Sequence, residues 1–257
     1  LPTSSVRPSS FLLLSLYPYI LYPQHASQPL NNLSHVAPHL RTHHSTGGSG
    51  FLGSMTVKLC LQRGWIVKTT TRNPKKHSKR LHNLVPTKSH NLTIHQLDFL
   101  APTAEDDLTN IFQECDVIMH TASPFFVKGA TLDNVVKPAV EGTRKVLNSA
   151  SKANVQNIIL TSSTASIYAW YGNKPLDHIM TEEDWSNEQA LLDHSNYYPI
   201  SKMRAEKLAW TLSKQLNLNL AVMNPCLIWY AVYNIYLCFP FHPLIFHQKL
   251  QIVFCII

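Results

Sequence analysis

The chain of 257 residues has no acidic side chains over long stretches at both ends. All 15 Asp and Glu residues lie between Asp98 and Glu206, and residues 1–45 contain none. From Pro225 onward, Lys249 is the only Asp, Glu, Lys or Arg. The two ends of the chain therefore differ in charge composition from the middle. We expect a disordered extension over 1–45, one domain over 46–225 and an apolar tail over 226–257.

Paired cysteines and clustered positive charge are also missing. The cysteines show no Cys-x-x-Cys pair or other paired spacing; they are Cys60, Cys115, Cys226, Cys238 and Cys255. The sequence therefore predicts no metal site and no disulfide framework, but the reduced thiols of a cytoplasmic protein. The formal net charge of +7 is spread along the chain, which argues against nucleic acid as a partner.

No apolar run is long enough to cross a membrane. The run over 11–22 is interrupted by Pro18, and the run over 226–241 falls short of the about 20 residues that a bilayer requires. A membrane partner is therefore not expected. The first run resembles the apolar part of a secretory signal, but residues 24–27 make a poor cleavage site. A targeting peptide stays an alternative to the disordered extension.

Three glycines mark the most informative stretch of the chain. Gly47, Gly50 and Gly53 form a Gly-x-x-Gly-x-x-Gly loop, followed by a predicted helix over 54–63 and a predicted strand over 65–71. In such a loop glycine permits a tight turn, close approach to a pyrophosphate and close packing of the helix on the sheet. The phosphates then lie at the helix N-terminus, where free N–H groups and the helix dipole favour anions. Taken alone, a glycine-rich turn of no special function is an equally good explanation.

An acidic residue is missing at the end of the strand predicted over 65–71, where the adenine ribose of a dinucleotide would lie. Arg72 stands there instead, with Lys75, Lys76 and Lys79 behind it. A carboxylate would favour the 2′-hydroxyl of NAD, whereas a guanidinium favours the 2′-phosphate of NADP. The sequence therefore predicts NADP, with a solvated basic loop as the alternative.

The apolar strand that should precede the glycine loop is missing as well. Residues 39–45 read His-Leu-Arg-Thr-His-His-Ser, whereas a strand buried on both faces is normally a run of Val, Ile and Leu. We therefore expect a degraded first strand that weakens the core and the cofactor site.

The remaining chain alternates strands and helices. Strands are predicted over 92–97, 115–124, 155–163 and 218–223, and helices over 105–113, 131–153 and 197–216. Residues 73–88 are predicted as helix or coil, and Pro138 is expected near the first turns of its helix or at a kink. This alternation predicts an α/β fold with a doubly wound parallel sheet, the Rossmann fold.

Three side chains are candidates for catalysis. Tyr198 and Lys202 lie four residues apart in a predicted helix, so both project from one face, and we expect the ammonium to lower the pKa of the phenol. Ser163 ends a predicted strand, at the edge where open α/β sheets bind ligands, and its hydroxyl can donate to a carbonyl oxygen. Taken alone, Ser162 and Ser163 are better explained as strand-end caps.

In this order, the features resemble the extended short-chain dehydrogenase/reductases of the NAD-dependent epimerase/dehydratase superfamily. The resemblance is strongest to the dihydroflavonol reductase and cinnamoyl-CoA reductase group, and it covers residues 46–229. The matching segments are Thr46–Ser54, Thr71–Pro74, Leu97–Asp98, His120–Pro124, Lys137–Thr143, Thr161–Ser163, Glu183–Trp185, Tyr198–Lys202 and Asn224–Pro225.

The resemblance implies an NADP-dependent oxidoreductase that reduces the carbonyl group of a small-molecule aldehyde or ketone. Tyr198 would donate the proton, Lys202 would modulate Tyr198 and hold the ribose, and Ser163 would polarise the carbonyl. The implied cofactor-binding residues are Gly47, Gly50, Phe51, Leu52, Gly53, Arg72, Lys79, Asp98, Phe99, Thr121, Ala122, Ser123, Thr161, Tyr198, Lys202 and Pro225.

The chain also departs from the family pattern. Besides the polar first strand, Tyr230-Ala231 replaces the usual Gly-Pro, and the expected C-terminal substrate lobe is truncated. One alternative is therefore a cofactor-binding fragment without activity. Another is a nucleotide-sugar epimerase or dehydratase with tightly held NAD, which Arg72 disfavours.

Overall fold

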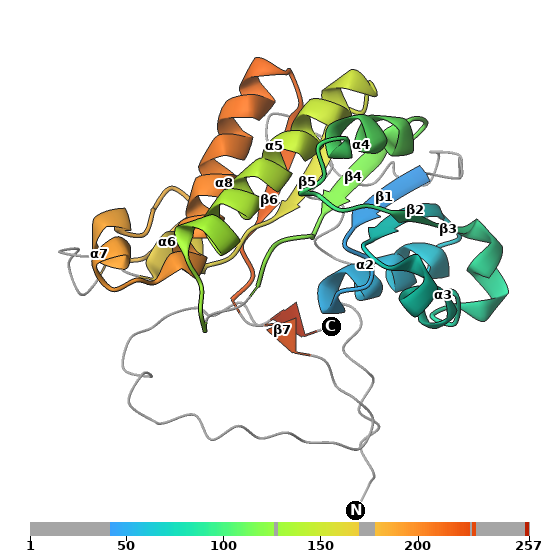
Figure 1. Cartoon of the computed structure of the whole chain (residues 1–257), viewed down its shortest axis with the longest axis horizontal. Coiled ribbons are helices and arrows are strands. Elements are labelled where there is room, and N and C mark those ends of the chain that lie inside the picture. The colour runs from blue at the N-terminus through green and yellow to red at the C-terminus, as the bar shows by residue number, and fades with distance from the viewer. Residues whose placement is uncertain (1–41, 126–127, 170–177, 227, 230–254, 257) are drawn as a thin grey trace, which may run out of the picture. The chain divides into compact units, whose positions relative to one another are not determined.

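A computed structural model describes residues 42–125, 128–169, 178–226, 228–229 and 255–256 (Figure 1). Of these, residues up to Asn224 belong to one compact unit, and the described residues from Pro225 onward belong to a second. In the second unit, β7 (Ile228–Trp229) pairs in parallel with β8 (Cys255–Ile256). The predicted extension over 1–41 and most of the predicted apolar tail lie outside the described residues.

The first unit contains a six-stranded sheet in the order β3-β2-β1-β4-β5-β6, and every neighbouring pair is parallel. The predicted doubly wound α/β fold is confirmed. The strand order reverses between β1 and β4, and ligands bind at the carboxyl edge of such a reversal. The strands are β1 (Thr42–Thr46), β2 (Ile66–Thr71), β3 (Leu92–Gln96), β4 (Val117–His120), β5 (Asn157–Thr161) and β6 (Asn219–Met223).

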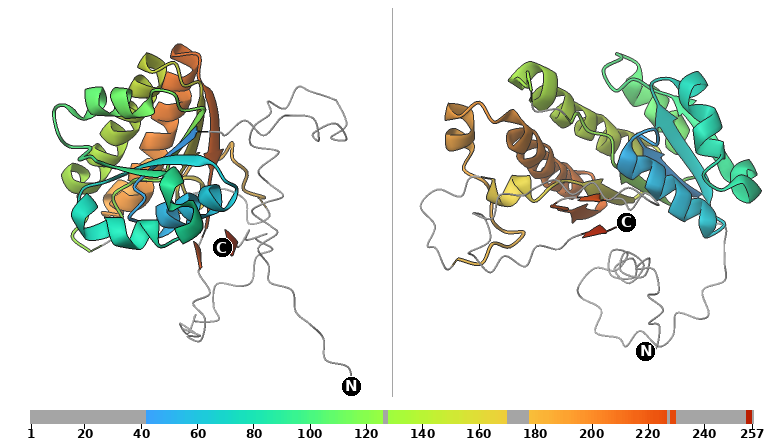
Figure 2. Two further views of the ribbon diagram at one scale, coloured as in Figure 1. Left: turned by 90° about the vertical axis from the view of Figure 1, so that its right-hand side faces the viewer. Right: turned by 90° about the horizontal axis from the view of Figure 1, so that it is seen from below.

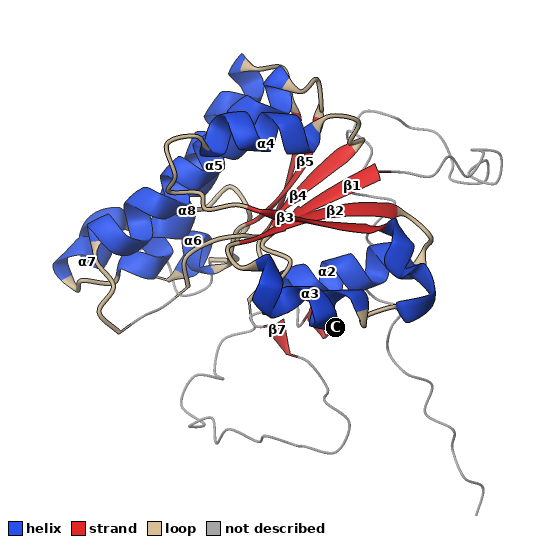
Figure 3. Cartoon of the chain, turned by 45° about the vertical axis from the view of Figure 1, so that its right-hand side comes forward, coloured by secondary structure: helices blue, strands red, loops and turns tan. Residues whose placement is uncertain are grey.

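Helices cover both faces of the sheet (Figure 3). One face carries α2 (Phe51–Gln62) and α3 (Pro74–His82). The other carries α4 (Ala104–Phe112), α5 (Lys137–Lys152) and α8 (Tyr197–Gln215), with α5 and α8 side by side (Figure 2). Four of these helices therefore fall where the sequence predicts helix, and α3 falls in the stretch predicted as helix or coil.

Shorter helical segments join these elements. The segment between β5 and α8, for which the sequence predicts no helix, contains two helices, α6 (Ala165–Tyr168) and α7 (Glu188–Asp193). A 3-10 segment, η2 (Pro86–Asn91), precedes β3, and a π-helical turn, η3 (Leu132–Val136), leads into α5. Pro138 lies in the first turn of α5, where its missing N–H costs no intrahelical bond.

The strand predicted to be degraded is polar, yet it pairs fully on both sides. β1 is the partner of β2 and β4, and His43, His44, Ser45 and Thr46 are all at most 2% exposed. Backbone hydrogen bonds do not depend on side-chain type, and the rings provide the packing area: His43 stacks on Trp65 at 4.0 Å between ring centroids. Where the family pattern has apolar side chains in the first strand, this chain therefore buries the imidazole rings of His43 and His44. β1 also begins before the predicted domain boundary at residue 46.

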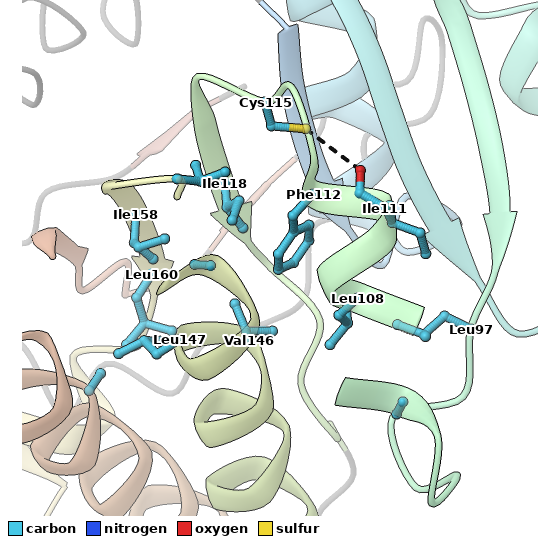
Figure 4. Packing of buried hydrophobic residues seen from close by; sticks show 14 residues of the cluster. Leu97, Leu108, Ile111, Phe112, Cys115, Ile118, Val146, Leu147, Ile158 and Leu160 are labelled. Carbon is cyan, nitrogen blue, oxygen red and sulfur yellow. Dashed lines mark hydrogen bonds between the residues drawn. The ribbon is translucent and has the colours of Figure 1, made fainter. Parts of the chain in front are cut away.

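The main core cluster lies between the sheet and helices α4, α5 and α8 (Figure 4). Its fully buried members include Leu108, Phe112, Ile118 and Leu147. Cys115 belongs to the same cluster and donates a weak hydrogen bond to the Ile111 carbonyl at 3.8 Å. Burial of these apolar side chains fixes β4 and β5, whose carboxyl ends carry the candidate site.

Candidate active site

The glycine loop follows β1 and is shaped by steric limits. Gly47 has φ of +69°, a conformation that side chains other than glycine rarely adopt. A Cβ on Gly48 would collide with the Thr69 side chain, and one on Gly53 would collide with the Gly47 carbonyl oxygen. Gly48 lies outside the three glycines that the spacing singled out, so its steric role is visible only in the structure.

The loop opens onto the N-terminus of α2. Gly50 is the N-cap residue, it provides no side-chain cap, and the first turn of α2 contains no acidic residue. The first N–H groups of a helix have no partner within the helix and favour an anion. The residues present therefore fit the pyrophosphate of a dinucleotide, with Gly47, Gly50 and Gly53 as close-approach positions and Phe51 and Leu52 in the first turn.

Two contacts hold the outer side of this loop. The Thr71 hydroxyl at the end of β2 lies 3.0 Å from the Ser49 hydroxyl, and the Arg80 guanidinium of α3 donates to the Ser49 carbonyl at 2.6 Å. Arg72 and Lys79 are exposed, with Arg72 directly after β2 and Lys79 on α3. Arg72 thus stands at the carboxyl end of β2 and Lys79 in the last turn of α3, and Arg80 is an additional cation that sequence reasoning missed.

Thr46 joins the glycine loop to the segment after β4. Its hydroxyl oxygen accepts from the N–H groups of Thr121 and Ala122, each at 3.0 Å, and lies 2.9 Å from His120 Nδ1. The Thr46 hydroxyl proton is therefore directed to Nδ1, which leaves the His120 proton on Nε2, facing the Thr143 hydroxyl at 3.4 Å. Burial lowers the pKa of His120 to about 3, so the ring is neutral. Sequence reasoning assigned no role to these polar contacts.

The three predicted catalytic residues come together. The Ser163 side chain, just after β5, lies close enough to the Tyr198 phenol of α8 to lower its pKa. The Lys202 ammonium, one turn further along α8, lies 6.0 Å from the centre of the Tyr198 ring and donates to the Thr161 carbonyl at 3.2 Å. Ser163 and Lys202 are 6% and 8% exposed, so both are screened from water. The site is built from the carboxyl end of β5 and the first turns of α8.

The expected pKa of Tyr198 needs correction. Burial raises the pKa of the phenol above 10, and the Ser163 side chain lowers it in part. Lys202 does not set its value, because the ammonium points to a backbone carbonyl rather than to the phenolic oxygen. Burial lowers the pKa of Lys202 itself to about 8, so the ammonium is mostly charged at neutral pH. Tyr198 is therefore protonated, which suits a proton donor.

A small pocket lies at this edge of the sheet. It brings four of the predicted cofactor-binding residues together: Ala122, Ser123, Thr161 and Lys202. His120, Thr143, Leu160, Ser162, Ala205 and Glu206 also line it. The pocket thus joins the segment after β4, which contacts the glycine loop, to the lysine of the catalytic trio.

Other predicted cofactor residues lie elsewhere. Asp98 is exposed after β3 and accepts from the Leu100 N–H at 3.0 Å, while the half-buried Phe99 ring lies 5.9 Å from the His120 ring. Pro225 belongs to the second compact unit. Phe125 was missed: 74% exposed, it sets its ring edge-to-face against Tyr198 at 5.2 Å.

Two features are absent from the described residues. No described helix is both long and apolar enough to span a membrane. No group of three or more His, Cys, Asp or Glu side chains within the described ranges has the arrangement of a metal site.

Comparisons with known proteins agree with this geometry. The model of the NAD dependent epimerase/dehydratase family matches residues 46–230. Cinnamoyl-CoA reductase 2 of Arabidopsis thaliana is 35% identical over 184 residues, which are 71% of this chain and 53% of that protein. Anthocyanidin reductase of Arabidopsis thaliana is 34% identical over 187 residues, 71% of this chain and 54% of that protein.

Solved structures give the same result. Yeast methylglyoxal/isovaleraldehyde reductase Gre2 complexed with NADPH is 25% identical with a TM-score of 0.64, covering 73% of this chain and 58% of that chain. Vestitone reductase from alfalfa (Medicago sativa) is 30% identical with a TM-score of 0.60, covering 72% and 56%. The chain thus spans about half the length of the curated relatives it matches. The resemblance to the dihydroflavonol reductase-like group is confirmed, and the chain belongs to the NAD-dependent epimerase/dehydratase family.

Proposed function

We propose that this chain is an NADP-dependent carbonyl reductase of the short-chain dehydrogenase/reductase type, which acts on the CH–OH group of its alcohol product. One observation carries the proposal: Ser163 lies close enough to the Tyr198 phenol to lower its pKa, with the Lys202 ammonium 6.0 Å from the Tyr198 ring at the carboxyl edge of the sheet. The names of the matched proteins support it, because they include cinnamoyl-CoA reductase, anthocyanidin reductase and a Gre2 complex with NADPH.

The chain's own residues supply the acid and the positioning. Ser163 donates to the carbonyl oxygen as negative charge develops there, and Tyr198 transfers its phenolic proton to that oxygen. The Lys202 ammonium, held by its hydrogen bond to the Thr161 carbonyl, is placed to hold ribose hydroxyls. NADPH, when bound, supplies the hydride.

The cofactor has a defined place in this proposal. Its pyrophosphate would lie on the N–H groups of the Gly47–Gly53 loop, and its 2′-phosphate on Arg72 and Lys79. Asp98 and Phe99 would lie at the adenine, and Thr121 to Ser123 and Thr161 would lie along the strand edge. The substrate is a small-molecule aldehyde or ketone. We infer the cytoplasm as its compartment, since the buried Cys60 and Cys115 are free thiols.

Titration of NADPH into the purified chain tests the proposal. We expect saturable quenching or enhancement of NADPH fluorescence, and consumption of NADPH when a panel of aliphatic and aromatic aldehydes and ketones is added. Binding without consumption of NADPH by any member of the panel would favour the fragment without activity. A chain that is folded by circular dichroism but does not bind NADPH would contradict the proposal.

Replacing Arg72 tests the cofactor preference. In Arg72→Ser we expect the Kd for NADPH to rise about 10- to 100-fold, because a charge-assisted hydrogen bond to phosphate contributes roughly 1.5–3 kcal/mol. The Kd for NADH, which has no 2′-phosphate, should change little. Lys88→Ser on η2 is the matched control, since it removes one exposed positive charge elsewhere. Equal weakening of NADPH and NADH binding would place Arg72 outside the phosphate site.

A further inference from the structure

We propose that Glu206 is a positioning residue of this site, whose buried carboxylate fixes the turn that carries Ser163 and compensates the charge of Lys202. This inference rests on the proposed function and names a fourth residue for the same reaction. Glu206 lies on α8 and is 3% exposed. A carboxylate so far removed from water requires hydrogen-bond donors or a cation.

Three donors meet on one oxygen of this carboxylate. Ser162 Oγ lies 2.5 Å from Glu206 Oε2, and Ser166 Oγ and Asn224 Nδ2 each lie 2.9 Å from it. The donors come from the end of β5, from α6 and from the residue after β6. Glu206 therefore links the segments that follow β5 and β6 and the helix α6, next to the turn that contains Ser163.

The same network reaches Ser163. Asn224 Nδ2 also lies 3.3 Å from the Ser163 carbonyl oxygen, which accepts in addition from the Ser166 N–H at 3.0 Å. Ser162 and Ser166 flank this turn, and both contact Glu206. The backbone around Ser163 is thus held from both sides, which sets where its hydroxyl meets the Tyr198 phenol.

Glu206 also faces Lys202. The two residues are four apart on α8, so they share one face of the helix, and both line the small pocket. The titratable groups that interact with Lys202 are Tyr198 and Glu206 from α8 and His120 from β4, and His120 is neutral. The Glu206 charge raises the pKa of Lys202 against the opposing effect of burial. Removing that charge would leave a buried cation uncompensated.

The titration of Lys202 tests this directly. The full chain is labelled with [¹³C]lysine, and the Lys202 resonance is assigned as the one lost in Lys202→Met. In Glu206→Gln we expect the midpoint of that resonance to fall from about 8 by about one pH unit or more, since a nearby opposite charge shifts a pKa by roughly 1–3 units. Glu182→Gln, which removes an exposed carboxylate, should leave the midpoint in place.

A second measurement separates positioning from a merely structural role. The alkaline limb of the kcat/KM profile of Glu206→Gln should move to lower pH by the same amount as the Lys202 midpoint. A folded Gln variant with an unchanged Lys202 midpoint would overturn the inference. If Gln prevents folding, Glu206→Asp replaces it, with a smaller fall supporting the inference and no fall overturning it. Because the titration needs no turnover, a lowered midpoint in a chain without activity would refute only the proposed function.

Discussion

The Tyr198→Phe chain is expected to lose carbonyl reduction by a factor of about 10² to 10⁴ while it keeps its affinity for NADPH. The factor is that of a positioned general acid. Burial raises the pKa of the Tyr198 phenol, so the phenol still holds its proton at neutral pH and can act as the acid. Phe has the same ring and preserves the edge-to-face contact with Phe125, so packing should be retained. Steady-state oxidation of NADPH at 340 nm and a fluorescence titration measure the two quantities.

Tyr197 offers a matched control one residue away. It is the first residue of α8 and packs against the small core cluster of Val136, Leu191 and Ile200 rather than into the site. Tyr197→Phe removes the same hydroxyl group from the same helical turn and should keep turnover within about twofold of the unmodified chain. Turnover in Tyr198→Phe that matches this control would refute the assignment of the proton donor.

Acidification should destabilise the fold by about 4 kcal/mol between pH 7.5 and pH 5. Burial lowers the pKa of His44 and of His120 to about 3, against 6.5 for an unfolded histidine. The folded chain therefore binds fewer protons than the unfolded chain below pH 6.5. The stability is fully present above pH 6.5 and is lost progressively as the pH falls toward 3.

The magnitude follows from the linkage relation. At pH 5 an unfolded histidine is almost fully protonated while the folded one is still neutral, so each group removes roughly 2 kcal/mol from the free energy of unfolding. Two groups give about 4 kcal/mol, a large share of the 5–15 kcal/mol typical of a domain. The carboxyl groups Glu105 and Glu141, whose pKa values are lowered by ion pairs, titrate below this window. Urea unfolding followed by circular dichroism at pH 7.5, 6 and 5 measures the loss.

His44→Leu isolates one half of this effect. Neither ring nitrogen of His44 has a hydrogen-bond partner among the described residues, and the ring packs edge-on against Phe112 at 4.9 Å. Leucine should therefore give equal or greater stability at pH 7.5 and reduce the loss between pH 7.5 and pH 5 by about half. An unchanged loss in this variant would show that other groups govern the acid transition.

Most of the fold follows from local patterns. Alternating and β-branched runs such as 65–71 and 155–163 predicted strands that the structure contains with ends shifted by one or two residues. The helices over 105–113 and 197–216 were predicted as closely. These patterns indicate which face of each helix or strand is buried, so the helices and strands can be predicted from local sequence alone. The helix α6 was not predicted, because its four residues make about one helical turn and a repeating pattern of apolar residues needs several turns.

The sequence by itself determined the order of elements, the glycine loop, the basic end of β2 and the spacing of Tyr198 and Lys202, because each depends on residues close together in the chain. Tertiary structure alone decided that a histidine-rich segment forms the central strand, since its pairing with β2 and β4 involves the backbone of distant residues. It also decided the protonation of Tyr198 and the place of Glu206. Burial and hydrogen bonds between residues about 40 positions apart control both, and no local pattern encodes them.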